Sequence, residues 1–425
     1  MGSQEQFQTS GYHANLKAAA TISLAIVFLA TILVAPALSA QQLNQLAYFT
    51  GPNGNAPNGD LTLDAAGNVY GTTFYGGKYG TDGPGTVFKL TRKGSGWIFS
   101  SLYDFTGYND GGTPWGGVIF GPDGALYGTT AEGGRYGHGT VFKLQPPATR
   151  CATAFCYWSE TVLYSFTGGS DGSGPQGELI FDHAGNLYGT TYYGGQGSGS
   201  GNGVVYELSP SQGSWSINVL YAFTGGADGG GPGDGVVMDQ AGNLYGTATY
   251  GGGAHSLGVV YELRHIASGW TETVLHDFTG GADGKFPTGL VLDSSGNVYG
   301  GTFEEGSLDG GTAYELQPSG GGFSYNIIYS FDGSTAGAPY PVAAFTVDNA
   351  GNLYGTGGGG TGGGGTIYEL SPSGGGWNLT VLWNFNIYNG LEPGSKPVLD
   401  AQGNLYGTTE LGGVDGDGVV WELTP

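Results

Sequence analysis

The sequence predicts an all-β fold, a seven-bladed β-propeller of four-stranded blades. Three observations lead to this prediction: one unit recurs seven times, each unit contains four short β-like runs, and the two chain ends complement each other. The segment GNLYGT or a close variant marks each unit. Its tyrosines are 52 to 61 residues apart, at Tyr70, Tyr127, Tyr188, Tyr245, Tyr299, Tyr354 and Tyr406. A fixed period of this length is typical of propellers and solenoids.

The composition is compatible with such a loop-rich β protein. The chain has 90 glycines in 425 residues, about three times the usual frequency of roughly 7%. Glycine alone would allow disorder, but 13% of the residues are aromatic and only 11% are charged. A chain of this kind can bury enough apolar surface to fold.

The fourth copy shows the four runs, which we name strands A to D. They read GVVMD, NLYGTA, GVVYEL and WTETVLHDF, and the segment TGGADGKFP follows. The A–B connection has the pattern D-x-x-G-N, as in Asp239 to Asn243. Asp at the start of a tight turn and Gly at its end predict a hairpin.

Strand D carries two aromatic residues at a constant spacing of eight. The pairs are Trp97 and Phe105, Trp158 and Phe166, Trp215 and Phe223, Trp270 and Phe278, Phe323 and Phe331, and Trp377 and Phe385. Strict alternation along a strand would place both members on one face. We expect them to pack between neighbouring sheets.

The chain ends predict a closed ring. The last copy ends after strand C, at residues 418–423, without a strand D. The segment QLAYFTGPNGNAP near the N-terminus matches the end of a strand D and its following turn, with Phe49 aligned to Phe105. The first and last segments should therefore share one sheet, which closes a propeller but not an open solenoid.

The N-terminal region has the order of a secretory signal. Lys17 precedes an apolar run of about 18 residues, and small residues follow up to Ala40. Residues 1–40 are predicted to be a signal peptide or an uncleaved N-terminal membrane segment, and residues 41–425 the propeller. Either alternative places the propeller outside the cytoplasm, secreted or anchored at its N-terminus. Cys151 and Cys156, in a short insertion, are predicted to form a disulfide.

The charge excludes one class of partner. The formal net charge is −23, and after Arg150 the basic residues are Arg264, Lys285 and Lys396. Nucleic-acid binding needs clustered Lys and Arg, so nucleic acid and anionic membrane surfaces are set aside as partners. We expect a monomer whose partner is a polysaccharide or a cell-surface protein.

The GNLYGTT and GTVFKL units resemble the GloVer tandem repeat of secreted bacterial "choice-of-anchor" proteins. The DxxGNLY turn is also similar to that of NHL and SMP-30-like propeller blades. The resemblance covers residues 41 to 425. It implies a propeller fold and no established activity.

The D–A connections repeat the pattern D/N-G-x-x-P and give a first candidate site. The aspartates of this pattern are Asp110, Asp171, Asp228 and Asp283. If they ring the channel mouth they could bind a hard cation such as Ca²⁺ through oxygen ligands. Alternatively, each Asp caps its own turn and the proline sets the entry to strand A.

A second candidate site consists of positions at which the copies differ. Just after the D–A proline the chain has Asp60, Trp115, Glu178, Asp234, Tyr340 and Lys396. The B–C loops, predicted on the same face, add His138 and His255. Aromatic platforms beside carboxylates suit a glycan or protein ligand, which predicts a binding or scaffold module. The alternative is a metal-dependent lyase or hydrolase, with a metal held by Asp60, Glu178 and Asp234 and with His138 or His255 as base.

The glycine run at residues 357–365 resembles a domain linker. It follows strand B of the sixth copy and precedes strand C. The repeat therefore predicts a hairpin loop with almost no side chains in this blade.

Overall fold

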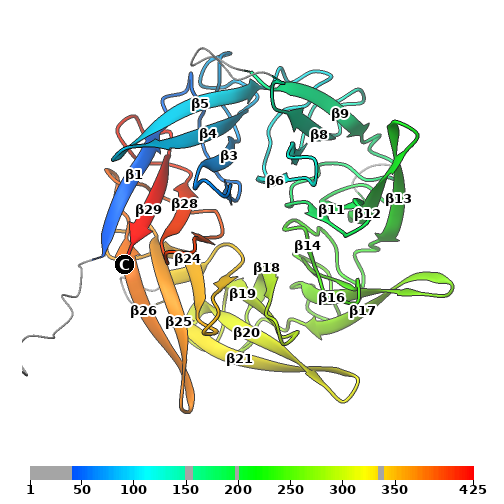
Figure 1. The fold of residues 1–425 in the computed structure, drawn as a ribbon. Helices are drawn as coiled ribbons and strands as arrows, with labels where there is room; N and C mark the ends of the chain where they lie inside the picture. The colour runs from blue at the N-terminus through cyan, green and yellow to red at the C-terminus, as the bar shows by residue number, and fades with distance from the viewer. Residues whose placement is uncertain (1–40, 149–156, 197–200, 334–338) are drawn as a thin grey trace, which may run out of the picture. The chain divides into compact units, whose positions relative to one another are not determined.

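The computed structural model describes residues 41–148, 157–196, 201–333 and 339–425. The predicted N-terminal segment and the predicted disulfide of Cys151 and Cys156 lie outside these residues. The compact unit Gln42–Thr424 forms seven antiparallel sheets arranged in a ring, the predicted propeller (Figure 1). Within the described residues, there is no helix long and apolar enough to cross a membrane.

In each blade the strands follow the chain from strand A at the centre to strand D at the rim (Figure 1). Blade 1 is β2 (Thr62–Leu63), β3 (Val69–Thr73), β4 (Thr86–Lys93) and β5 (Gly96–Asp104). Blade 2 is β6 (Val118–Phe120), β7 (Leu126–Thr130), β8 (Thr140–Gln145) and β9 (Ser159–Ser165). Blade 3 is β10 (Ile180–Phe181), β11 (Leu187–Thr191), β12 (Val204–Ser211) and β13 (Ser214–Ala222). Blade 4 is β14 (Val236–Met238), β15 (Leu244–Ala248), β16 (Val259–Ile266) and β17 (Gly269–Asp277).

Blade 5 follows this plan, whereas blades 6 and 7 depart from it. Blade 5 is β18 (Lys285–Leu292), β19 (Val298–Glu304), β20 (Asp309–Ser319) and β21 (Gly322–Asp332). In blade 6 both β22 (Pro339–Pro341) and β23 (Thr346–Val347) pair with β24 (Leu353–Gly359), followed by β25 (Thr366–Ser373) and β26 (Gly376–Asn384). Blade 7 is β27 (Val398–Leu399), β28 (Leu405–Thr409), β29 (Val419–Thr424) and, from the other chain end, β1 (Gln42–Tyr48).

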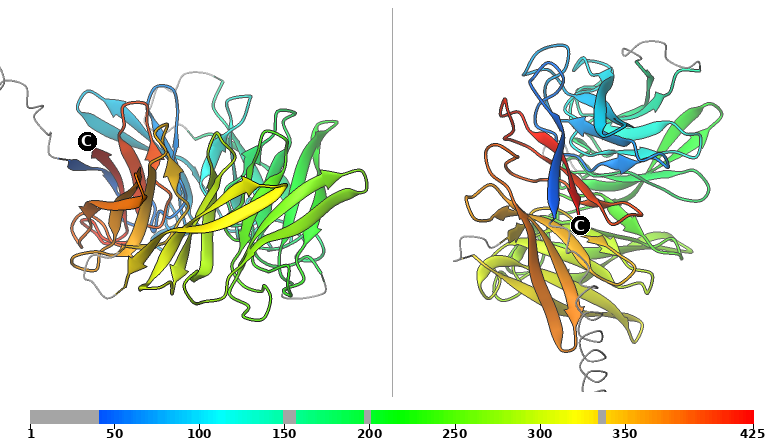
Figure 2. Two further views of the ribbon diagram at one scale, coloured as in Figure 1. Left: turned by 90° about the horizontal axis from the view of Figure 1, so that it is seen from below. Right: turned by 60° about the vertical axis from the view of Figure 1, so that its left-hand side comes forward.

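Strand β1 closes the ring as predicted. It pairs antiparallel with β29, with Gln42 opposite Thr424 and Tyr48 opposite Val419. In Figure 2 β1 (blue) lies beside β29 (red). Phe49, which follows β1, is fully buried against Phe88 at a ring-centroid distance of 5.3 Å.

The A–B turn is held by its aspartate. In blade 1 Oδ1 of Asp64 accepts hydrogen bonds from the backbone N–H groups of Ala66 and Asn68, and Oδ2 accepts from the Asn68 amide and the Tyr70 hydroxyl. This network explains why Asp, Asn and Tyr recur together in the DxxGNxY pattern. The same Asp–Tyr bond recurs from Asp182, Asp239, Asp293, Asp348 and Asp400.

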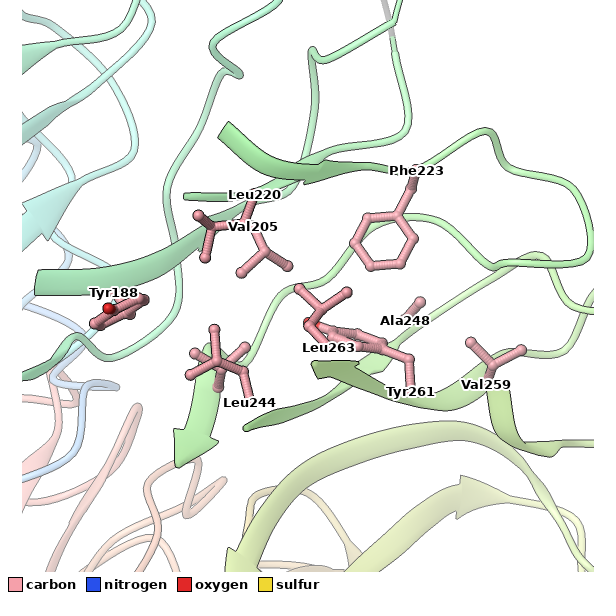
Figure 3. Packing of buried hydrophobic residues seen from close by; sticks show 10 residues of the cluster. Tyr188, Val205, Leu220, Phe223, Leu244, Ala248, Val259, Tyr261 and Leu263 are labelled. Atoms are coloured by element: carbon pink, nitrogen blue, oxygen red, sulfur yellow. The ribbon is translucent and has the colours of Figure 1, made fainter. Parts of the chain in front are cut away.

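The glycine of the LYGT segment makes room for the aromatic residue of strand C. A Cβ on Gly246 would lie 2.3 Å from the Tyr261 hydroxyl oxygen, and one on Gly407 would lie 2.3 Å from the Trp421 ring. These rings are fully buried and form the centre of the packing between blades. Figure 3 shows one such interface, in which Val205 and Phe223 of blade 3 pack against Leu244 and Tyr261 of blade 4.

The prediction that both aromatics of strand D share one face is wrong, because strand D contains a bulge. In blade 1 Val87 pairs with Tyr103 but the next residue, Phe88, pairs with Ser101, so one residue is inserted. Trp97 then packs in the core on one side of the blade, and Phe105 packs in the core on the other side. The same shift occurs in blades 2 to 6. Packing of these aromatics between sheets is confirmed.

The loop formed by the glycine run of blade 6 is shorter than predicted. Gly357 to Gly359 belong to β24 and pair with β22, so the hairpin loop is limited to residues 360–365. Two further glycines in it are packed: a Cβ on Gly364 would lie 2.4 Å from the Phe385 carbonyl oxygen, and one on Gly365 would lie 2.2 Å from Pro393. The run is therefore part of the blade.

Candidate functional site

A cavity of about 690 Å³ lies at the centre of the ring, and all seven blades contribute to its wall. Most of its lining comes from the D–A connections, directly before each strand A. Isolated bridges join these connections to the B–C loops of the same blades, for example Asn55 with Tyr75 and Ser173 with Tyr193. The prediction that both sets of loops lie on one face of the ring is thus confirmed.

Glycines let the D–A connections approach each other around the cavity. A Cβ on Gly117 would lie 2.1 Å from the Asp60 carbonyl oxygen, and one on Gly177 would lie 2.2 Å from the Gly235 nitrogen. The first threonine of strand B links neighbouring blades by a hydrogen bond. The Thr72 hydroxyl donates to the Gly116 carbonyl oxygen at 3.0 Å, and the Thr356 hydroxyl donates to the Ser395 carbonyl oxygen at 2.8 Å. The D–A connections are therefore tightly packed around the cavity, and much of its wall consists of backbone atoms.

Three side chains at one repeat position meet in the cavity. Asp60, Glu178 and Lys396 each stand three residues after the D–A proline of their copy. The Lys396 ammonium lies 3.1 Å from Asp60 Oδ2 and 3.0 Å from Glu178 Oε2. The backbone N–H of Lys396 also donates to Asp60 Oδ1 at 2.7 Å. Blade 2 has Gly117 at this position, so no side chain intervenes between blades 1 and 3.

This ion triad is largely shielded from solvent, with side-chain exposures of 26% for Lys396, 20% for Asp60 and 25% for Glu178. Desolvation alone would lower the pKa of Lys396, but the charges of Asp60 and Glu178 outweigh it and raise that pKa. Enclosure in the cavity raises the pKa of Glu178, against the opposing effect of Lys396. Lys396 is therefore protonated and supplies the positive charge of the site.

Asp234 is the fourth charged side chain and lies apart from the triad. It leans over Gly289 of blade 5, where an added Cβ would lie 3.2 Å from the Asp234 Cβ. Its side chain is exposed to the cavity, and the surrounding wall limits its solvation. Together with the charge of Asp60, this enclosure raises the pKa of Asp234 to about 6, while Lys396 acts in the opposite direction. No hydrogen-bond or ion-pair partner of this carboxylate is found among the described residues.

The remainder of the wall is apolar on one side and aromatic at one edge. Blades 5 and 6 contribute Leu290, Val342, Ala343 and Ala344. Trp115 of blade 2 is 41% exposed and is held edge-on against Phe74 of blade 1 at 4.8 Å between ring centroids. A large, fixed aromatic surface thus stands beside charged groups.

Five predicted residues come together here: Asp60, Trp115, Glu178, Asp234 and Lys396 all line the cavity. Our interpretation of the sequence missed further lining residues, namely Asn58, Gln176, Phe303, Glu392 and Glu410. Phe303 and Glu410 stand four residues after the tyrosine of strand B, a position at which the copies also differ. That variation was a signal which could have identified them.

The other three predicted binding residues lie away from the cavity lining. The Tyr340 hydroxyl donates to the Gly333 carbonyl oxygen at 3.2 Å. His138 Nδ1 is 3.0 Å from Ser173 Oγ, and His255 is exposed. The lyase or hydrolase alternative requires a histidine beside Asp60, Glu178 or Asp234. Neither His138 nor His255 lines the cavity that contains these carboxylates.

The four aspartates predicted as calcium ligands each cap their own turn. Asp110 accepts hydrogen bonds from the Thr106 backbone, the Thr106 hydroxyl and the Tyr103 hydroxyl. Asp171, Asp228 and Asp283 repeat this arrangement, with His276 in place of the tyrosine for Asp283. None of the four lines the cavity. Among the described residues, no three His, Cys, Asp or Glu side chains are grouped to hold a metal ion.

Comparison with known proteins gives a family and a fold. The sequence profile of the Gloeobacter/Verrucomicrobia repeat matches residues 32–254, 153–291 and 252–425. A search of curated protein sequences gave no match. Among solved structures, the extracellular domain of the one-component system BT4673 from B. thetaiotaomicron has a TM-score of 0.54 at 13% identity, and the match covers 89% of this chain and 41% of that chain. A Bacteroides uniformis protein described as a 6-phosphogluconolactonase has a TM-score of 0.51 at 13% identity, covering 80% and 88%. At such identities the likeness shows the fold alone.

Proposed function

The chain belongs to the Gloeobacter/Verrucomicrobia repeat family, and on that basis we propose that it is an extracytoplasmic binding propeller that holds a saccharide in its central cavity. One observation carries this proposal. The cavity gathers the positions at which otherwise similar copies differ: Asp60, Trp115, Glu178, Asp234 and Lys396. A residue needed only for the blade would recur in every copy, whereas a ligand site on a repeat protein requires an asymmetric set.

The chemistry of the lining suits a polyhydroxylated ligand. The cavity volume lies in the range of small-molecule sites, and its wall combines apolar surface with a few polar groups. Carboxylates and the amides of Asn58 and Gln176 can exchange hydrogen bonds with hydroxyl groups. Trp115 offers a broad face to the apolar side of a sugar ring. The location outside the cytoplasm is supported by the signal-like order of residues 1–40.

A binding module is preferred to the metal-dependent lyase or hydrolase. The Lys396 ammonium occupies the space between Asp60 and Glu178, where that mechanism would need the metal. We therefore retain the enzyme only as the hypothesis that the binding experiment must exclude, by showing that bound saccharide is recovered uncleaved.

The test is isothermal titration calorimetry of the purified chain with neutral, amino and acidic tetrasaccharides. We expect at least one class to bind, and Trp115→Ala to weaken its binding at least tenfold. Tyr108→Ala is the matched control, because Tyr108 is 78% exposed and lies outside the cavity. Absence of binding by every class, or equal losses in the two variants, would overturn the proposal.

A further inference from the structure

The charges that line the cavity are unevenly balanced. Its lining has five carboxylates, Asp60, Glu178, Asp234, Glu392 and Glu410, but a single basic residue, Lys396. The ammonium of Lys396 already serves two of them, Asp60 and Glu178. Three carboxylates are therefore left without a cation from the lining. A ligand carrying carboxylate or phosphate groups would meet like charge on most sides.

Asp234 lies where a ligand can reach it. It lines the cavity together with the apolar residues Leu290 and Ala344, and both its Cβ and that of Ala344 lie beside Gly289. Its carboxylate has no partner among the described residues, so its acceptor capacity is open to a ligand. A pyranose ring against the apolar wall would present a substituent to this carboxylate.

We propose that the cavity selects saccharides that carry a protonated amine over neutral and acidic saccharides, with Asp234 as the acceptor of the amine. The apolar wall and the ion triad define where the ligand's amine would lie in the cavity. The negative net charge of the lining defines the class of ligand. A charge-assisted hydrogen bond is shorter and about twice as strong as a neutral one. Selection therefore needs only one ammonium placed at Asp234. This inference rests on the proposed function and specifies its ligand.

The pH dependence follows from the groups around Asp234. The enclosing wall and Asp60 favour its protonated form, and Lys396 opposes this. The tyrosines whose pKa values its charge raises are Tyr192, Tyr261 and Tyr314. With a pKa of about 6 the carboxylate is mostly ionised at pH 7.5 and mostly protonated at pH 5. A saccharide ammonium stays charged at the lower pH. Its affinity should therefore fall at pH 5, while the affinity of a neutral saccharide should not.

The experiment compares three tetrasaccharides by calorimetry with the purified chain: a tetramer of 6-glucosamine (6-amino-6-deoxyglucose; the glucosamine tetramer), whose primary amines are protonated at both pH values used, cellotetraose and tetragalacturonate. At pH 7.5 we expect the glucosamine tetramer to bind at least tenfold more tightly than cellotetraose, and tetragalacturonate not to bind. Asp234→Asn should remove the difference between the first two and keep the affinity for cellotetraose within threefold. Asp82→Asn, which removes the same charge from an exposed B–C loop, should leave the preference intact.

The outcomes separate this inference from the proposed function. If cellotetraose binds as tightly as the glucosamine tetramer, or if Asp234→Asn preserves the preference, saccharide binding stands and amine selection is wrong. If none of the three binds, both are wrong. The wild-type comparison between pH 7.5 and pH 5 gives the same decision without a substitution.

Discussion

Lys396 shows how one side chain can set the chemistry of a repeat protein. Its ammonium bridges carboxylates from two other blades, Asp60 of blade 1 and Glu178 of blade 3. An ion pair this shielded is a weak source of stability when compared with apolar packing, but breaking it leaves charges without partners. The triad therefore fixes the position of the D–A connections and fills the space in which an added metal ion would bind.

Removal of the Lys396 ammonium should destabilise the protein in a pH-dependent manner. In Lys396→Met the carboxylates of Asp60 and Glu178 lose their counter-charge, which we expect to lower the free energy of unfolding by about 2 kcal/mol at pH 8. The pKa of Glu178, which Lys396 now holds down, should rise further in the folded variant. The variant should therefore regain stability as the pH falls, because protonation removes the unpaired negative charge, and should lose that stability as the pH rises. Chemical denaturation at pH 5 and pH 8 measures this.

The triple variant Lys396→Met, Asp60→Asn, Glu178→Gln provides the control. With the charges removed together, its stability at pH 8 should exceed that of Lys396→Met. Equal stability of the single and triple variants would mean that the loss comes from packing of the lysine stem.

Glu160 and Glu272 are half-buried acids at positions where other blades have apolar residues. The corresponding residues in blades 1 and 3 are Phe99 and Ile217. Among the described residues, Oε1 of each glutamate is buried without a hydrogen-bond partner. Burial, followed by the charge of a nearby aspartate, raises the pKa of both carboxyls to about 7. Their ionised forms are thus poorly accommodated in the fold.

The substitution Glu160→Gln should stabilise the protein at high pH only. Because the folded pKa lies above the unfolded value of 4.5, the stability linked to the bound proton is present below pH 4.5 and lost as the pH rises through 7. After a discount for partial exposure, we expect a gain of about 1 kcal/mol at pH 8. Denaturation at pH 4 and pH 8 tests this, with Asp82→Asn as the exposed control. An equal gain at pH 4 would contradict the explanation.

At the scale of elements, the sequence predicted the units better than the faces of their strands. The repeated turn and the LYGT segment have local causes, Asp64 bonded to Tyr70 and Gly246 beneath Tyr261, so pattern reading suffices for them. The opposite faces of Trp97 and Phe105 depend on a bulge created by pairing with β4. A rule of strict alternation cannot anticipate an inserted residue.

The sequence predicted the part of the candidate site that consists of residues at one repeat position. Counting from the proline identified Asp60, Glu178 and Lys396, because repeats carry equivalent residues to equivalent places. Tyr340 does not share this count, because it lies between Pro339 and Pro341 in β22, which pairs with the extended β24. Variation among the copies also marked the position of Glu410, but its place in the cavity wall depends on the ring, which brings the end of strand B to the cavity.

The D–A glycines should be intolerant of side chains. In Gly177→Ala the new Cβ would lie 2.2 Å from the nitrogen and 2.5 Å from the Cα of Gly235, which must move blade 4 away. We expect a loss of about 1 to 3 kcal/mol, measured by denaturation. Gly374→Ala, at which a Cβ has no atom within 4 Å, should cost far less. Equal effects would show that glycine acts here through chain flexibility alone.

At the scale of the molecule, ring closure depends on β1. A chain that begins at Thr50 lacks the buried residues Leu46, Ala47 and Phe49 and exposes the edge of β29. From the apolar area lost, we expect the free energy of unfolding to fall by about 5 kcal/mol. An exposed edge also promotes association between chains.

Thermal unfolding and light scattering after size exclusion measure both effects of this truncation. A chain that begins at Gln41 is the control and should unfold at the temperature of the full chain. Partial recovery of the truncated chain by an added peptide of residues 41–49 would support strand replacement. Unchanged stability of the chain that begins at Thr50 would show that the other blades hold the ring without β1.

The pairing of β1 with β29 also determines when folding can end. The hydrogen bond between Thr424 and Gln42 joins residues 382 positions apart, whereas neighbouring strands within a blade are joined by short connections. Local hairpins can form early, but this last contact must first overcome the entropy of closing a very long loop. During synthesis or export from the N-terminus, β1 is the first strand to emerge and the last to find its partner. Until the final residues arrive, the protein exists as an open arc with two unpaired edges, and this is the state that quality-control factors would meet.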